Sequence, residues 1–109
     1  MSNIIKLTDD NFVDEIQTTN KLSIVVFSAT WCGPCKKYTP IIEKIATYYK
    51  GIVKVGKMDI DDSRTTAAIF NVMSVPTTII CKGALVVKQL VGVQREGILK
   101  KIIEQNYRG

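Results

Sequence analysis

The chain has 109 residues, of which 46% are hydrophobic and 23% are charged, a length and balance typical of one globular domain. Its net charge is +5, but the basic residues are dispersed rather than clustered with aromatic residues, which argues against nucleic acid as a partner. The first ten residues lack the apolar segment of a secretory signal, and no apolar run approaches the ~20 residues that cross a membrane. We therefore expect one domain over residues 1–109, monomeric and cytoplasmic.

The first predicted element is a helix that begins after Thr8 and ends near Asn20, because Thr is a favourable N-cap and apolar residues follow at helical spacing. The next element is a strand over residues 22–27. Its centre, residues 24–27, is apolar on both faces, which indicates a central strand covered by helices on each side.

The clearest element is a long helix that begins near Cys32 and ends at Gly51. Its apolar residues recur with the period of a helix: Tyr38, Ile41, Ile42, Ile45, Ala46 and Tyr49. Pro40 lies inside this span and should kink the helix without ending it. Residues 52–60 then predict a strand.

The C-terminal half predicts shorter elements. In chain order these are a helix capped by Ser63 and running through Phe70, a loop over 72–76, a strand over 77–81, a turn at 82–84, a strand over 85–91 and a helix around Leu99 and Ile102. The turn is so short that its two strands should form an antiparallel hairpin. Helices and strands alternate before the hairpin, so the sequence predicts an α/β fold with a mixed sheet covered on both faces.

The segment Cys32-Gly33-Pro34-Cys35 carries the chemistry. Two cysteines at this spacing can close a small disulfide ring, and thiol–disulfide exchange needs a ring that opens and closes easily. At the start of a helix, unpaired N–H groups and the helix dipole would stabilise the Cys32 thiolate, which is the nucleophile. Cys35 would lie one turn further in, less exposed, and attack the mixed disulfide between Cys32 and a substrate. Gly33 lets a partner backbone approach, and Pro34 suits the first helical turn.

Metal binding and simple packing are the alternatives for these thiols. Zinc normally takes four nitrogen or sulfur ligands, whereas the chain has no His and only one cysteine beyond the pair, Cys81. An iron–sulfur cluster shared between two chains is a further alternative. A CxxC segment that follows a buried strand and opens a helix favours the redox interpretation.

Cys81 lies in the apolar run of residues 78–81. Free cysteine often behaves as a small hydrophobic residue, so we interpret Cys81 as a buried strand residue. The alternative is a regulatory thiol that is open to glutathione or to dimerisation.

The segment Trp31-Cys32-Gly33-Pro34-Cys35-Lys36 matches the active-site sequence of thioredoxins, and the chain resembles that family along its whole length. Other residues at the spacing of this family are Pro40, Lys57, residues 75–77 and residues 91–93. The resemblance implies a thioredoxin fold, in which a central mixed sheet of about five strands is flanked by about four helices.

The same resemblance assigns roles to the site residues. Cys32 would attack the substrate disulfide, and Cys35 would resolve the mixed disulfide. The supporting residues would be Gly33, Pro34, Lys57 and Pro76, the last with a cis peptide bond that faces the sulfurs. The groove for the substrate backbone would be lined by Trp31, Ile60, Met73, Ser74, Val75, Gly92 and Val93. Without the motif, the residues alone would favour core packing for Trp31 and ordinary strand burial for Ile60 and Val93.

A protein of this kind would reduce disulfide bonds in other proteins. A flavin-containing thioredoxin reductase would recharge it from NADPH, so the chain itself would need no bound cofactor and no metal. Two other function classes stay open: an oxidant or isomerase of the same fold, and a non-catalytic partner subunit. The Gly33-Pro34 pair and the missing secretory signal favour the reductase, because an oxidant needs an oxidising compartment.

Val26 departs from the family pattern, since a typical thioredoxin has a buried aspartate there. The general base thought to deprotonate Cys35 is therefore missing, and Lys57, Asp59 or water are its candidate substitutes. Burying an ionisable group without full pairing is costly, so we expect Val26 to stabilise the fold while it slows resolution or moves its pH optimum.

Ser28 is a second departure, at a position where the family commonly has another tryptophan beside the active site. The groove wall would be smaller there, or filled by Tyr38 or Met73 instead. Met73 is apolar and adaptable, which suits a surface that accepts many partners. The resemblance therefore leaves room for a substrate preference unlike that of a typical thioredoxin.

Overall fold

Five strands form one mixed sheet in the computed structural model, which describes residues 3–107. The strands are β1 (Ile5–Leu7), β2 (Leu22–Ser28), β3 (Val53–Asp59), β4 (Thr77–Lys82) and β5 (Leu85–Val91). Their order across the sheet is β1-β3-β2-β4-β5, with β1 and β2 parallel to β3 and β4 antiparallel to β2 and β5. The predicted mixed sheet, the central position of β2 and the β4–β5 hairpin are confirmed.

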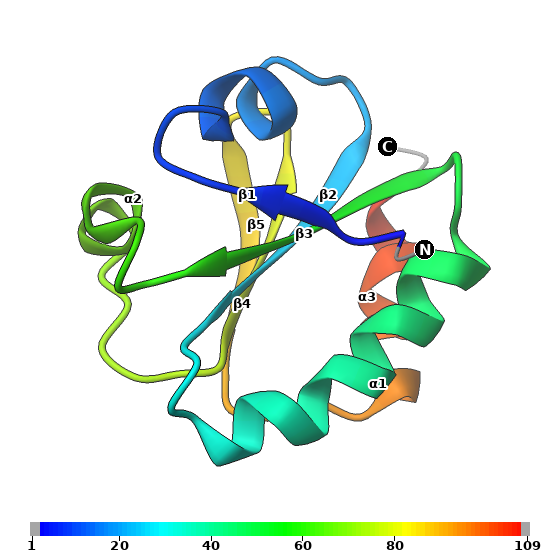
Figure 1. The fold of residues 1–109 in the computed structure, drawn as a ribbon. Coiled ribbons are helices and arrows are strands. Elements are labelled where there is room, and N and C mark those ends of the chain that lie inside the picture. Colours follow the sequence, from blue (N-terminus) through cyan, green and yellow to red (C-terminus); the bar gives the residue numbers. More distant parts are fainter. Residues whose placement is uncertain (1–2, 108–109) are drawn as a thin grey trace.

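Helical segments cover both faces of this sheet. They are α1 (Gly33–Tyr48), α2 (Arg64–Ile69), α3 (Glu96–Asn106) and a π-helical segment (Val13–Gln17). On one face, α1 and α3 pack against Ile24 and Val26 of β2; on the other, α2 and the π-helical segment enclose Val25 and Phe27. Figure 1 shows α1 and α3 together at the right of the view and α2 at the left. The alternation of side chains along β2 therefore builds two hydrophobic cores.

The N-terminal segment differs from the prediction in two ways. Residues 5–7 form an edge strand that the sequence analysis did not locate, paired with β3 so that Leu7 lies opposite Met58. The predicted helix to Asn20 is wrong in length, since only the π-helical segment forms. The Thr18 hydroxyl donates to the Asp14 carbonyl, and such local bonds compete with helix propagation.

Thr8 is not the N-cap of this segment, which is Phe12, but its side chain bonds within the turn that precedes it. Its hydroxyl accepts the N–H of Asn11 at 3.3 Å, and the Asn11 side-chain oxygen accepts the N–H of Thr8 at 2.7 Å. The exchange of two hydrogen bonds across four residues resembles a capping box. Thr8 and Asn11 thus fix the turn that leads from β1 across the sheet.

Ser63 stands at the N-cap of α2, but its side chain does not cap the helix. Its hydroxyl is buried and has no hydrogen-bond partner among residues 3–107. Asp9 takes the role instead, because its carboxylate accepts the Thr66 hydroxyl at 2.6 Å and the Thr66 N–H at 2.9 Å. These bonds hold the pKa of Asp9 below its usual value. A carboxylate distant in sequence has replaced the local cap that the sequence predicted.

α1 carries the cysteine segment at its first turn. Cys32 is its N-cap, and Pro34 lies where a missing N–H costs no helical hydrogen bond. The helix continues past Pro40, which faces solvent, and ends at Tyr48, just before Gly51 adopts a left-handed conformation with φ +84°. Within residues 3–107, no helix combines the length and the apolar character that spanning a membrane would require.

Candidate active site

Cys32 and Cys35 form a disulfide at the N-terminus of α1, with their Cα atoms 5.3 Å apart. The Cys35 N–H donates to the Cys32 sulfur at 3.1 Å. This N–H belongs to the first turn of the helix, where backbone donors have no partner within the helix. Both residues are only 4% exposed. The expectation that Cys35 is the less exposed of the two is therefore wrong for the oxidised ring, because Ile60 and Val75 pack against both sulfur-bearing residues.

The segment before β4 faces this disulfide. The Val75–Pro76 peptide bond is cis, as the resemblance implies, and the Val75 carbonyl oxygen lies 3.7 Å from the Cys32 sulfur. The Thr77 hydroxyl donates to the Ser74 carbonyl at 2.7 Å, and the Gly92 N–H donates to the Pro76 carbonyl at 2.8 Å. Gly92 has φ +90°, a conformation that favours glycine. These bonds fix the backbone beside the disulfide.

The predicted groove residues include two large apolar side chains that are exposed. Trp31 is 67% exposed and Met73 is 90% exposed, so core packing is wrong for Trp31. The other predicted groove residues are exposed or half-buried: Ile60, Ser74, Val75, Gly92 and Val93. Strand burial is also wrong for Ile60 and Val93, since they follow β3 and β5 instead of lying within them.

The orientation of Trp31 depends on a residue that the sequence analysis missed. The Trp31 indole N–H donates to the Asp61 carboxylate at 2.9 Å. Asp61 follows β3 in the run Asp59-Ile60-Asp61-Asp62, and this cluster of acids at the end of a strand was the available signal. Asp61 therefore restricts the rotation of the exposed Trp31 ring, which precedes Cys32 in the chain.

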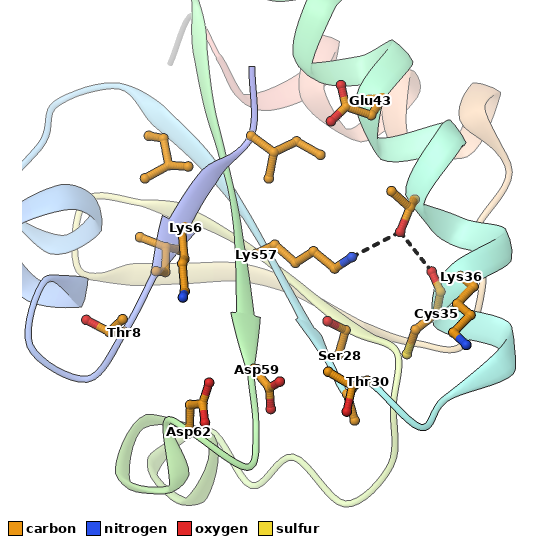
Figure 2. Close-up of a pocket in the computed structure, with 15 residues that line it drawn as sticks. Lys6, Thr8, Ser28, Thr30, Cys35, Lys36, Glu43, Lys57, Asp59 and Asp62 are labelled. Atoms are coloured by element: carbon orange, nitrogen blue, oxygen red, sulfur yellow. Dashed lines mark hydrogen bonds between the residues drawn. The ribbon is translucent and has the colours of Figure 1, made fainter. Parts of the chain in front are cut away.

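Behind the disulfide, Val26 lies buried against α1. The cavity that Val26 and Cys35 share measures only about 10 Å³. Lys57, which pairs with Val26 across β2 and β3, extends toward α1 and donates to the Thr39 hydroxyl at 3.0 Å. The Thr39 hydroxyl in turn donates to the Cys35 carbonyl at 3.1 Å, the chain of two bonds drawn in Figure 2. A cation is thus anchored to the backbone of Cys35.

Ser28 lines a second and much larger pocket of about 700 Å³, between β1, β3 and the first turns of α1. Neither Tyr38 nor Met73 is among the residues that line this pocket. The Tyr38 ring lies in the core, where its hydroxyl is 2.8 Å from that of Thr78, and Met73 projects into solvent. The space beside Ser28 therefore stays open, and Cys35 forms part of its wall.

Cys81 lies in the interior of β4 and is only 2% exposed. It belongs to the core cluster that contains Phe27 and Ile79. Burial raises the pKa of its thiol to about 11, which keeps it protonated at neutral pH. These surroundings agree with the interpretation of Cys81 as a packed strand residue.

Residues 3–107 contain no group of three or more His, Cys, Asp or Glu side chains placed to hold a metal ion. A reversible disulfide at a helix N-terminus can exchange electrons with a second dithiol without any further group.

Comparison with known proteins gives one consistent result. The Thioredoxin family model matches residues 3–105. A thioredoxin of Staphylococcus saprophyticus is 44% identical over 103 residues, which cover 94% of this chain and 97% of that protein. A thioredoxin of Staphylococcus haemolyticus is 43% identical over the same shares, and thioredoxin 2 of Chlorobaculum tepidum is 37% identical over 91% of each chain. With its disulfide at the start of α1 and a cis proline beside it, the chain belongs to the thioredoxin family of thiol–disulfide oxidoreductases.

Proposed function

We propose that this chain, acting as one domain over residues 1–109, reduces disulfide bonds in other proteins, with Cys32 as the attacking thiol and Cys35 as the resolving thiol. The observation that carries the proposal is the bond from the Cys35 N–H to the Cys32 sulfur at the N-terminus of α1. In the reduced protein, this donor and the positive end of the helix dipole stabilise a thiolate on Cys32. A thiolate is the species that attacks disulfides.

The reaction consists of two exchanges. The Cys32 thiolate attacks one sulfur of the substrate, forms a mixed disulfide and releases the first substrate thiolate. Cys35 then loses its proton and attacks the Cys32 sulfur, which breaks the mixed disulfide and releases the second thiolate. Two electrons have passed from the dithiol to the substrate, and the Cys32–Cys35 bond has formed.

The apolar residues around the disulfide serve as the docking surface. Trp31 and Met73 offer large exposed side chains, and Met adapts its shape to different partners. Val75, beside the Cys32 sulfur, presents a fixed backbone against which an extended substrate segment lies. Ile60, Ser74, Gly92 and Val93 complete the surface.

Recycling completes the proposed cycle. A thioredoxin reductase that draws electrons from NADPH returns the disulfide to the dithiol, and this chain binds no cofactor of its own. We place the activity in the cytoplasm, where thiols are kept reduced, and assign it to the monomer.

The test is reduction of insulin, coupled to NADPH consumption through thioredoxin reductase. The protein should support continuous turnover, and Cys32→Ser should lower the rate roughly a thousandfold or more, because the nucleophile is lost. Cys81→Ala is the matched control, since it removes a cysteine outside the site, and its rate per folded molecule should equal that of the wild type.

Equal rates for Cys32→Ser and the wild type would contradict the proposal. The potential of the Cys32–Cys35 couple separates the reductase from an oxidant of the same fold. A potential near that of a protein-disulfide oxidant, about −120 to −180 mV, would replace the proposed direction of electron flow with the opposite one.

A further inference from the structure

Cys35 lies between two cavities that differ in size and lining. The smaller cavity, beside Val26, measures about 10 Å³, which is room for about one water molecule at most. None of the described residues that line it carries a carboxyl or imidazole group. Lys57 is part of this lining, but a lysine ammonium group is a hydrogen-bond donor only. The Val26 side therefore offers Cys35 no carboxylate or imidazole that could accept its proton.

The larger cavity, of about 700 Å³, also reaches Cys35 and has a different lining. Its charged residues are Lys6, Lys36, Glu43, Lys57, Asp59 and Asp62. A space of this size has room for several water molecules, which can bridge the charged groups in its lining. A proton that leaves Cys35 can therefore reach a carboxylate only on this side.

The register of the sheet singles out Asp59 among the three carboxylates. Val26 pairs with Lys57, and two residues further along both strands Ser28 pairs with Asp59. Since side chains alternate along a strand, these two pairs share the face that α1 covers. The Asp59 carboxylate accepts the N–H of Asp61 at 2.8 Å through one oxygen, which fixes its orientation.

The other two carboxylates are placed less well. Asp62 is exposed in the turn after β3. Glu43 lies eight residues after Cys35 on α1, which corresponds to about 12 Å along the helix axis. In Figure 2, Ser28 lies between Asp59 and Cys35 in the view. A larger side chain at position 28 would fill this part of the cavity.

We propose that Asp59, acting through water in the larger cavity, accepts the proton of Cys35 when Cys35 resolves the mixed disulfide. This inference rests on the proposed function and names the acid that replaces the one missing at Val26. The two departures from the family pattern then act together. Val26 leaves the Val26–Lys57 pair without a carboxylate, and the small side chain of Ser28 leaves open the space between Cys35 and Asp59.

The Cys35 thiol proton passes to a water molecule, which gives a proton to the Asp59 carboxylate. The Cys35 thiolate forms the bond to the Cys32 sulfur while the bond between Cys32 and the substrate breaks with both its electrons on the substrate sulfur. Asp59 then returns its proton to the solvent. The Lys57 ammonium, held beside Cys35 by Thr39, favours the thiolate electrostatically throughout.

The test is a stopped-flow reaction of the reduced protein with an excess of a chromogenic aromatic disulfide. Attack by Cys32 releases one coloured thiolate, and resolution by Cys35 releases the second. The rate of the second phase should change little with pH around neutrality, since the proton of Cys35 passes to a carboxylate rather than to hydroxide. In Asp59→Asn it should be roughly a hundredfold slower at neutral pH and rise about tenfold per pH unit, following the thiolate fraction.

Matched variants separate this role from a structural one. Asp62→Asn removes the same charge from the same cavity and should keep the wild-type profile. Ser28→Leu should reproduce the steep profile with Asp59 intact, whereas Ser28→Ala should keep the flat one. The proposal would be overturned if the rate of the second phase had the same pH dependence in Asp59→Asn as in the wild type. It would also be overturned if Asp62→Asn slowed this phase as much as Asp59→Asn does. Loss of the first phase in the wild type would instead refute the proposed function.

Discussion

The cysteines of this chain are all buried, yet their surroundings differ. The Cys32 sulfur receives a backbone N–H at the start of a helix and lies beside exposed apolar residues. Cys81 lies within β4 among apolar side chains, and burial raises its pKa to about 11. Burial alone therefore does not decide whether a thiol can react. The groups that meet the thiolate decide it, since a backbone donor compensates the lost hydration and an apolar neighbour does not.

The largest effect should come from placing an ionisable group in the apolar wall behind Cys35. Val26→Asp buries a carboxyl group beside a cavity that holds about one water molecule at most, so the free energy of unfolding should fall by about 4 kcal/mol at neutral pH. Urea denaturation at several pH values measures this, and the loss should grow as pH rises and the carboxyl ionises. Val26→Asn is the neutral control, with a loss that does not depend on pH. Equal stabilities of Val26→Asp and wild type would show that the wall is hydrated.

A cavity beside Cys81 should cost almost as much stability without touching the chemistry. Ile79→Ala removes a buried side chain from the core that contains Cys81, and should lower the free energy of unfolding by about 3 kcal/mol. The insulin reduction rate per folded molecule should stay unchanged. Ile69→Ala, at an exposed isoleucine of α2, should change stability by less than about 0.5 kcal/mol. A slower reduction rate in Ile79→Ala would mean that the two cysteine regions are coupled.

The pKa of Cys81 makes stability depend on alkaline pH. A thiol whose pKa is higher in the folded state than in the unfolded state contributes nothing to this dependence below pH ~9, where both states are protonated. From there to pH ~11 only the unfolded chain ionises, so up to about 2–3 kcal/mol of stability should be lost. Denaturation of the oxidised wild type and of Cys81→Ala across this range isolates the effect. If the free energy of unfolding fell equally with pH in the wild type and in Cys81→Ala, Cys81 would be hydrated in the folded protein.

The smallest predicted effect concerns Met73, an exposed side chain of the proposed docking surface. Met73→Ala should raise the KM for insulin about fivefold, because an exposed anchor contributes about 1 kcal/mol of binding, and should leave kcat nearly unchanged. Thermal denaturation should show a stability equal to that of the wild type, since Met73 is not part of the core. An unchanged KM would remove Met73 from the docking surface.

The sequence was sufficient to predict the features that rest on strong local patterns. The helical period after Cys32, the doubly apolar run of β2 and the short turn between β4 and β5 each have one dominant physical cause, and each was confirmed. The cis bond at Pro76 followed from the family resemblance. The exposure of Trp31 did not follow from the residues, because a tryptophan next to a buried strand suits the core equally well.

The remaining features depend on contacts between distant residues. Asp9 caps α2 from more than fifty positions away, while the nearby Ser63 does not, and no local rule predicts this exchange. The anchor from Lys57 through Thr39 to Cys35 needs β3 and α1 to be packed together first. The pocket at Ser28 likewise exists only once β1 lies beside β3.

The pairing of β1 with β3 limits when the N-terminal segment can join the sheet during biosynthesis. β1 contacts only β3 within the sheet, so its pairing partner lies about fifty residues further along the chain. During translation, β1 must wait until residues 53–59 have been made, and β2 waits for the same strand across a shorter stretch of chain. The N-terminal segment that lines the pocket beside Cys35 therefore docks only after β3 has been made, and until then a nascent chain exposes the surface that this segment covers.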